Sequence, residues 1–240
     1  MHFLVFQHIQ VEHPAVFRNF MMEDGISWDT VELDEGDTIP NLDDYDALIV
    51  MGGPMDVWEE NEHPWLVAEK EAIRKAIVDF KLPFLGFCLG HQLMADALGG
   101  KVGKMSEPEV GILDVELTAV GQKSALFSGL QKNIKTLQWH GAEVTEAPPG
   151  SLVLAQSPVC ATQALQYGES AFSMQCHIEL IDSTVSDWGQ VPEYEQSLEK
   201  TLGTGSLEKL NTEAEKHMID FNNSARLIYN NFIAQLRTLG

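Results

Sequence analysis

The stretch KLPFLGFCLGHQLMADALGG, residues 81–100, places one cysteine between two glycines. The apolar run 82–87 has the length of a strand and no helical stripe, so it predicts a buried strand. After Cys88 the apolar residues recur at helical spacing, and the glycine pair at 99–100 is typical of a helix end. Residues 86–90 therefore predict a G-x-C-x-G turn between a strand and a helix, which is the geometry of a nucleophile elbow.

This turn predicts an unusual environment for the Cys88 thiol. The thiol lies at the N-terminus of a helix, where unpaired N–H groups and the helix dipole favour the thiolate. Glycine is expected on both sides because a side chain there would collide with neighbouring backbone. Cys160 and Cys176 lack these surroundings, so we expect them to be inert buried thiols.

The composition limits the partners and the compartment. The 240-residue chain has 36 Asp and Glu against 15 Lys and Arg, a net charge of −21, and such a surface repels nucleic acid. Three cysteines without framework spacing favour a reducing compartment, so a cytoplasmic location is expected. The N-terminus MHFLVFQHIQ has no basic region typical of a signal peptide, and no apolar run approaches membrane-spanning length, so no membrane partner is expected.

The pattern along the chain predicts an α/β fold with a mostly parallel central sheet and helices on both faces. We expect a single domain over 1–240, with a core of about 1–180 and a helical C-terminal extension of about 181–240. The first half predicts strands and helices in alternation, with strands at 3–6, 27–33, 45–53 and 82–87 and helices near 14–24 and 63–80. Extra strands, some of them returning to the main sheet, are expected at 110–120, 134–144, 151–157, 161–168 and 170–180. The extension predicts two or three helices within 187–237, around a break at 203–205.

A cysteine nucleophile needs a base within hydrogen-bonding reach, and the base needs an orienting group. The sequence CHIEL at 176–180 supplies both, because residues i and i+2 of a strand point to the same face. His177 and Glu179 therefore form a predicted pair, with Cys176 and Ile178 on the opposite face. A carboxylate in this place can hold the tautomer of the imidazole and stabilise the imidazolium.

A second glycine turn, MGGPMDVWEE at 51–60, follows the strand predicted at 45–53. The carboxyl edge of an open α/β sheet is where such folds bind ligands. The N–H groups of Gly53 and Leu89 could there form a two-donor oxyanion hole.

Four segments together resemble the class I glutamine amidotransferases, and among them the free-standing proteins similar to the amidotransferase domain of GMP synthase. They are MGGPMDVWEENEHPWL (51–66), GFCLGHQLMADALGG (86–100), WHGAEV (139–144) and QCHIE (175–179). The resemblance implies that Cys88 is the nucleophile, His177 the base and Glu179 the orienting acid, with Gly53 and Leu89 as oxyanion donors. It also implies that Gln92 contacts substrate, and that the Met55 backbone and the His140–Gly141 loop form the wall of the glutamine pocket. No metal and no organic cofactor is implied.

The chain departs from the family pattern at two positions. Ile178 stands where the family usually has proline, and Ala142 follows Gly141 where relatives often have aspartate. No phosphate loop of the S-G-G-x-D-S type occurs in the sequence, so we expect any synthetase that accepts ammonia to be a separate chain.

Three functions remain open from the sequence. The preferred one is hydrolysis of glutamine to glutamate and ammonia through a thioester on Cys88, in support of a separate acceptor enzyme. The alternative is a hydrolase of γ-glutamyl peptides or γ-glutamyl amines with the same triad. The second alternative is a non-catalytic cysteine-elbow α/β protein without a working base, against which the H-x-E spacing argues.

Overall fold

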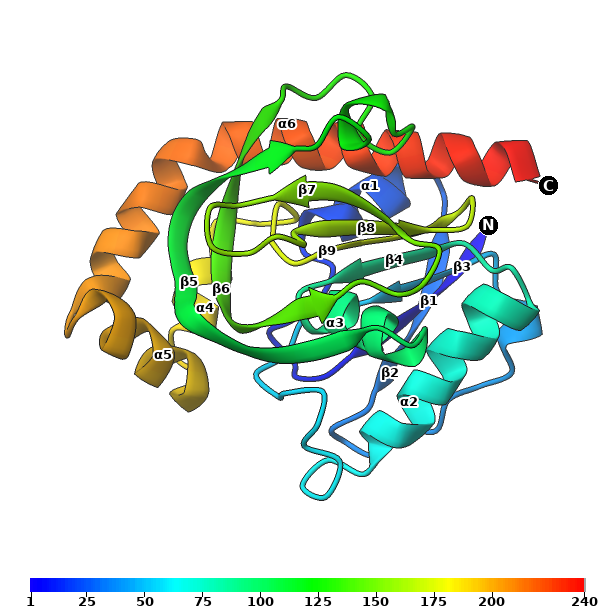
Figure 1. The fold of residues 1–240 in the computed structure, drawn as a ribbon, viewed down its shortest axis with the longest axis horizontal. Helices are drawn as coiled ribbons and strands as arrows, with labels where there is room; N and C mark the ends of the chain where they lie inside the picture. Colours follow the sequence, from blue (N-terminus) through cyan, green and yellow to red (C-terminus); the bar gives the residue numbers. More distant parts are fainter. Residues whose placement is uncertain (240) are drawn as a thin grey trace.

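A computed structural model describes residues 1–239. The strands are β1 (His2–Gln7), β2 (Ser27–Glu32), β3 (Ala47–Val50), β4 (Phe84–Phe87), β5 (Lys101–Leu117), β6 (Asn133–Glu146), β7 (Leu152–Gln156), β8 (Ala164–Tyr167) and β9 (Ala171–Met174). The α-helices are α1 (Val16–Glu23), α2 (Trp65–Arg74), α3 (Leu89–Ala97), α4 (Thr184–Trp188), α5 (Pro192–Leu202) and α6 (Ser206–Leu239). The strands form one sheet in the order β2-β1-β3-β4-β9-β8-β7-β5-β6 (Figure 1).

The sheet has a parallel half and an antiparallel half that meet at β9. Strands β2, β1, β3, β4 and β9 pair in parallel. Strands β8, β7, β5 and β6 continue the sheet with antiparallel pairing. The carboxyl ends of β1, β3 and β4 therefore lie at one edge, which is where ligands bind in open parallel sheets.

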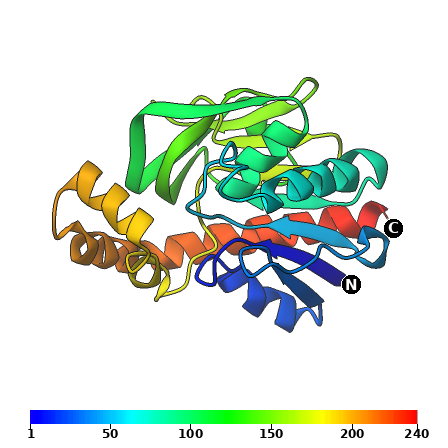
Figure 2. The ribbon, with the colours of Figure 1, turned by 90° about the horizontal axis from the view of Figure 1, so that it is seen from below.

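Helices cover both faces of the parallel half, as predicted. Alternate residues of β1 enter opposite cores: Phe3 and Val5 pack with α1 and α6, whereas Leu4 and Phe6 pack with α2 and α3. Side chains alternate across a strand, so a wholly buried strand reads as a continuous apolar run. Figures 1 and 2 show α6 as one long helix that curves in its first part and then runs along the sheet.

The helical extension is joined to the rest of the fold by a third apolar cluster. Trp188 of α4, Tyr194 of α5 and Phe221 of α6 are buried together with Leu137 and Trp139 of β6. This cluster brings α4 and α5 to the edge of the sheet at which the carboxyl ends of β1, β3 and β4 lie.

The elements agree with the sequence prediction in order and differ at some boundaries. The expected break at 203–205 separates α5 from α6, and all the extra strands join the main sheet. Strand β5 begins at Lys101, before the predicted start at 110, because it pairs with β6 across a β-bulge between Lys104 and Glu109. Strand β9 ends at Met174, so the strand predicted over 170–180 stops short of His177.

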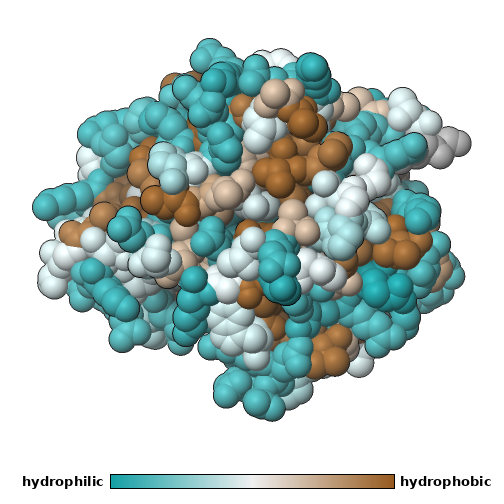
Figure 3. All heavy atoms as spheres, viewed as in Figure 1, coloured by the Kyte–Doolittle hydropathy of each residue, from teal (hydrophilic) through white to brown (hydrophobic). Residues whose placement is uncertain are grey.

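The face seen in Figure 3 shows hydrophilic residues around separate, smaller groups of hydrophobic ones. Over residues 1–239, no helix is both long and apolar enough to cross a membrane.

Candidate active site

The elbow predicted at Cys88 is present. Cys88 joins β4 to α3 with a φ of 48°, a conformation that residues with side chains rarely adopt. A Cβ at Gly86 would lie 2.7 Å from the Gly90 carbonyl oxygen, and one at Gly90 would lie 2.2 Å from the Val50 oxygen. Both glycines are required because the turn packs directly onto its own helix and onto the end of β3.

The predicted base and acid lie together beside this turn. His177 Nδ1 is 2.6 Å from Glu179 Oε1, and the Cys88 side chain lies close enough to His177 to act on its pKa. His177 is held by an isolated β-bridge, in which its N–H and C=O pair with Leu137 of β6 at 2.9 and 3.0 Å. The other carboxylate oxygen, Glu179 Oε2, accepts the Ile178 N–H at 2.9 Å.

The electrostatics of His177 favour the imidazolium. Burial alone would lower the pKa of His177, but the Glu179 carboxylate and the neighbouring Cys88 side chain outweigh burial and raise the pKa well above its usual value. His177 is 1% exposed and Glu179 2% exposed. Trp188 packs edge-on against the His177 ring with 4.6 Å between ring centroids, so α4 helps to exclude water from the pair.

A cavity of about 110 Å³ opens onto Cys88. Most of the predicted site residues line it, namely Gly53, Met55, Cys88, Leu89, Gln92, His140 and Gly141. His177 and Glu179 are not among the lining residues and are buried. Larger hollows of about 520 and 540 Å³ lie at the surface near Phe80, and they contain none of these residues.

The two predicted oxyanion donors, the N–H groups of Gly53 and Leu89, have no acceptor within residues 1–239. Among the described residues, neither the Gly53 N–H nor the Leu89 N–H has a hydrogen-bond acceptor, although both residues line the cavity with Cys88. Buried N–H groups are almost always paired. Two unpaired donors beside a nucleophile can stabilise a negatively charged oxygen.

Gln92 is oriented by two contacts on its amide nitrogen. That nitrogen donates to the Ala142 carbonyl oxygen at 3.2 Å and to Gln175 Oε1 at 3.0 Å. The Gln175 amide nitrogen in turn lies 3.6 Å from Cys88 Sγ. Gln92 can therefore offer only its oxygen to a ligand, and the Gln175 N–H is directed at the sulfur.

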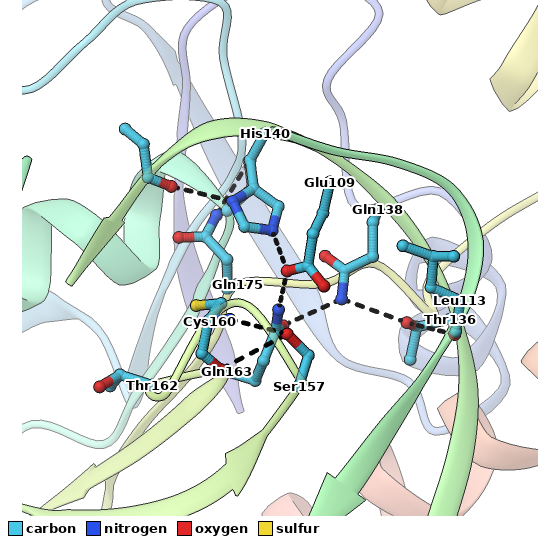
Figure 4. A network of polar contacts seen from close by, with 12 residues as sticks. Glu109, Leu113, Thr136, Gln138, His140, Ser157, Cys160, Thr162, Gln163 and Gln175 are labelled. Atoms are coloured by element: carbon cyan, nitrogen blue, oxygen red, sulfur yellow. Dashed lines mark hydrogen bonds and ion pairs between the residues drawn. The ribbon is translucent and has the colours of Figure 1, made fainter. Parts of the chain in front are cut away.

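His140 lines the cavity, but both of its ring nitrogens face groups of the protein. Its Nδ1 donates to the Ala142 carbonyl oxygen at 2.9 Å. Its Nε2 lies 3.2 Å from Glu109 Oε2, close enough for an ion pair but not aligned for a hydrogen bond. Figure 4 shows this buried network, in which Gln163 also donates to Glu109 at 2.6 Å. The loop that follows His140 is thereby fixed, and its backbone forms the cavity wall.

The sequence interpretation missed two groups beside the triad. Gln175 was detectable, because strand alternation places it on the face of His177. The other group is a buried pair in which the Tyr194 hydroxyl donates to Glu12, 182 positions away in the sequence. No local pattern reports such a contact. Burial raises the pKa of Glu12, and among residues 1–239 its Oε2 has no hydrogen-bond partner.

The remaining thiols have different surroundings. Burial raises the pKa of Cys160 to about 12 and also raises the pKa of Cys176. Across the described part of the chain, no group of three or more His, Cys, Asp or Glu side chains is placed to hold a metal ion.

Comparison with known proteins places this arrangement in a family. Residues 16–187 match the model of the glutamine amidotransferase class-I family. The chain therefore belongs to the class I glutamine amidotransferases, as its motifs indicated.

Individual relatives support the same family. The glutamine amidotransferase-like protein YfeJ of Salmonella typhimurium is 30% identical over 85% of this chain and 84% of its own length. One subunit of the glutamine-hydrolysing GMP synthase of Pyrococcus abyssi is 35% identical over 46% of this chain and 57% of its own length. γ-Glutamyl peptidase 3 of Arabidopsis thaliana is 28% identical over 68% of this chain and 67% of its own length. The crystal structure of a glutamine amidotransferase from Thermotoga maritima superposes with a TM-score of 0.86 and 26% identity, covering 97% of this chain and 98% of that one.

Proposed function

We propose that the chain hydrolyses the side-chain amide of glutamine to glutamate and ammonia through a γ-glutamyl thioester on Cys88. One observation carries the proposal. The cavity at Cys88 is bounded by the unpaired N–H groups of Gly53 and Leu89, and the His177–Glu179 pair lies beside the thiol.

The first half of the reaction forms the thioester. The Cys88 thiolate, paired with the imidazolium of His177, bonds to the carbonyl carbon of the substrate amide. The carbonyl oxygen takes the negative charge next to the N–H groups of Gly53 and Leu89. His177 then protonates the amide nitrogen, the C–N bond breaks, and ammonia leaves.

The second half releases the acid. His177 takes a proton from water while the water oxygen bonds to the acyl carbon. The S–C bond then breaks, the sulfur leaves as the thiolate, and His177 keeps the proton, which restores the starting ion pair. The sum is glutamine plus water giving glutamate plus ammonia, with Glu179 orienting His177 throughout.

The proposal includes an acceptor enzyme on a separate chain. The supporting relative is the GMP synthase protein of Pyrococcus abyssi, whose name describes one subunit of a glutamine-hydrolysing synthetase. Ammonia made without an acceptor would escape into water, so turnover is expected to increase when the partner binds.

A second candidate is the hydrolysis of a γ-glutamyl peptide or γ-glutamyl amine by the same residues. A specific observation favours it: Glu193, Tyr194 and Ser197 of α5 line the cavity, although α5 lies outside the family match. The likeness to γ-glutamyl peptidase 3 extends over two thirds of the chain. Groups that α5 adds to the cavity can contact a larger leaving group than ammonia.

The test is a steady-state screen of the isolated chain against glutamine, γ-glutamyl dipeptides and γ-glutamyl amines, with glutamate release as the readout and Cys88→Ala as the control. Slow glutamine turnover that rises with a synthetase partner supports the first candidate. Full turnover of a γ-glutamyl peptide, with glutamine a poor competitor, supports the second. No Cys88-dependent turnover of any compound would overturn both.

A further inference from the structure

A buried histidine lies beneath the Gly52–Gly53 turn. His8 follows β1, and its Nδ1 is 2.8 Å from the Gly52 carbonyl oxygen. Its Nε2 is 2.8 Å from Glu69 Oε1 of α2. Both side chains are wholly buried, and the His8 ring stacks on Trp65 with 5.5 Å between ring centroids. The reaction as written above makes no use of this pair.

The two contacts of His8 determine where its protons lie. A carbonyl oxygen can only accept, so His8 Nδ1 carries a hydrogen and donates it to Gly52. His8 Nε2 shares a second proton with Glu69. Burial acts to lower the pKa of His8, but the Glu69 carboxylate outweighs burial and raises the pKa. The donor facing Gly52 is therefore present whichever partner holds the shared proton.

The contact on Gly52 sets the direction of the next N–H. In a planar trans peptide, the C=O of one residue and the N–H of the next point in opposite directions. Because the Gly52 oxygen is directed at His8, the Gly53 N–H is directed away from His8. Gly53 lines the Cys88 cavity, and within residues 1–239 its N–H has no acceptor.

The turn offers little room on either side. A Cβ at Gly53 would lie 3.0 Å from His8 Cβ and 3.0 Å from a methyl carbon of Leu89. An unpaired buried N–H is costly, so a peptide with no anchor would gain by rotating its N–H out of the cavity. The hydrogen bond from His8 opposes that rotation.

We propose that His8, held by Glu69, is a positioning residue that fixes the Gly52–Gly53 peptide and so builds the oxyanion hole before substrate binds. The inference rests on the proposed acyl transfer at Cys88. It makes His8 and Glu69 responsible for stabilising the transition state, while neither touches the substrate.

The test compares His8→Leu with His8→Asn, whose amide N–H can replace the Nδ1 donor. The probe is glutamine or γ-glutamyl-p-nitroanilide, whichever the wild-type chain turns over faster. Loss of one oxyanion donor costs about 10²–10³-fold in kcat, so we expect a loss approaching this range in His8→Leu, with little change in KM. His8→Asn should restore most of the activity, and Glu69→Leu should show an intermediate loss.

A γ-glutamyl aldehyde separates positioning from general damage, because its adduct with Cys88 places an oxygen where the oxyanion forms. Its inhibition constant should rise in His8→Leu by the same factor by which kcat/KM falls. Alkylation of Cys88 by iodoacetamide, which forms no oxyanion, should keep its rate. His91→Leu is the matched control: His91 is also wholly buried and bonded on both ring nitrogens, to Ser173 and the Thr162 carbonyl. It should lose stability without this selective loss.

The outcomes separate the two proposals. If the wild-type chain turns over no γ-glutamyl probe, the proposed function fails. If it does, and His8→Leu keeps the wild-type kcat/KM and aldehyde affinity, the positioning role alone is overturned. Should His8→Leu fail to fold, Glu69→Leu decides: a lowered kcat with unchanged iodoacetamide reactivity supports the role, and unchanged kcat overturns it.

Discussion

At the scale of single residues, the thiol of Cys88 differs from the other two thiols in its backbone conformation and not in its burial. Cys88, Cys160 and Cys176 are all buried, but only Cys88 has a positive φ and begins a helix. The strain of such a φ persists only where surrounding packing enforces it, here through the contacts of Gly86 and Gly90.

We therefore predict that Cys88 is the only essential thiol. Cys88→Ala should abolish turnover and labelling by a diazoketone analogue of glutamine, because no thioester can form. Cys160→Ala and Cys176→Ala should keep labelling and lose only stability, since burial raises the pKa of both thiols. Mass spectrometry of the labelled protein gives the answer, and labelling of Cys88→Ala would contradict the assignment.

The triad should show graded losses. His177→Ala removes both proton transfers, and general acid–base catalysis contributes about 10²–10⁴-fold. Glu179→Gln should cost less in kcat, because glutamine keeps one oxygen for the two donors that Glu179 now accepts, His177 Nδ1 and the Ile178 N–H. Wild-type kcat in both variants would exclude His177 from the mechanism.

Ile178 is a departure from the family pattern that the structure connects to the triad. From the sequence we expected its side chain to lie on the face opposite His177 and Glu179. The side chain does pack in the apolar core, but its N–H donates to Glu179. Proline cannot make this contact because it has no N–H.

Ile178→Pro should accordingly weaken the orientation of Glu179. A hydrogen bond to a charged group contributes about 1.5–3 kcal/mol, so a fall in kcat of about tenfold is expected. Ile178→Val is the matched control, since it keeps the N–H and costs about 0.5–1.5 kcal/mol of stability by cavity formation. Equal kcat values for the proline and valine variants would show that the contact does not matter for catalysis.

At the scale of elements, the elbow and the core strands were predictable because their signals are local. The run at 82–87, the two glycines and the helical spacing after Cys88 all lie within twenty residues of sequence. The start of β5 was not predictable, because residues 101–109 become a strand only through pairing with β6. The contribution of α5 to the cavity wall was not predictable either, because the position of α5 depends on tertiary packing around Trp139 and Trp188.

The cavity-facing side of α5 should influence substrate choice. Glu193 and Glu195 of the same helix are both exposed, but only Glu193 is among the residues that line the cavity. Glu193→Gln should change KM or the ranking of γ-glutamyl leaving groups by several-fold, and Glu195→Gln should leave both unchanged. The measurement is the activity of each variant on the same panel of γ-glutamyl substrates. The two variants are matched because each removes one negative charge. If both rank the substrates identically, α5 takes no part in substrate recognition.

At the scale of the whole molecule, several buried groups bind protons more tightly in the folded chain than in the unfolded one. The pKa of His8 and that of His177 are raised by their carboxylate partners, and burial raises the pKa of Glu12. A group with a raised pKa adds to stability in full when the pH is below its pKa in the unfolded state. This contribution is lost as the pH rises through its pKa in the folded state. The unfolded values are 6.5 for histidine and 4.5 for glutamate.

Stability should therefore fall between pH 6 and pH 9. Each proton that the folded state retains and the unfolded state has released contributes about 1.4 kcal/mol per pH unit. Urea unfolding at pH 6, 7.5 and 9 measures the slope, and high salt separates these buried groups from the exposed part of the −21 net charge. The contribution of Glu12 is lost from pH 4.5 upward, so Glu12→Gln should flatten the profile from that pH. A stability that increases toward pH 9 would contradict the protonation states inferred here.

Helix α6 has a further consequence during synthesis of the chain. It supplies Ala225, Ile228, Tyr229, Phe232 and Ile233 to the core that also holds Phe17 and Phe87, yet all nine strands precede it in the sequence. At about 5–20 residues per second, the ribosome needs on the order of seconds to add these 34 residues. During that interval one apolar face of the nascent sheet is covered by α1 alone. A chaperone that binds exposed apolar surface should therefore capture ribosome-bound chains that end before residue 206, and release those in which α6 has emerged.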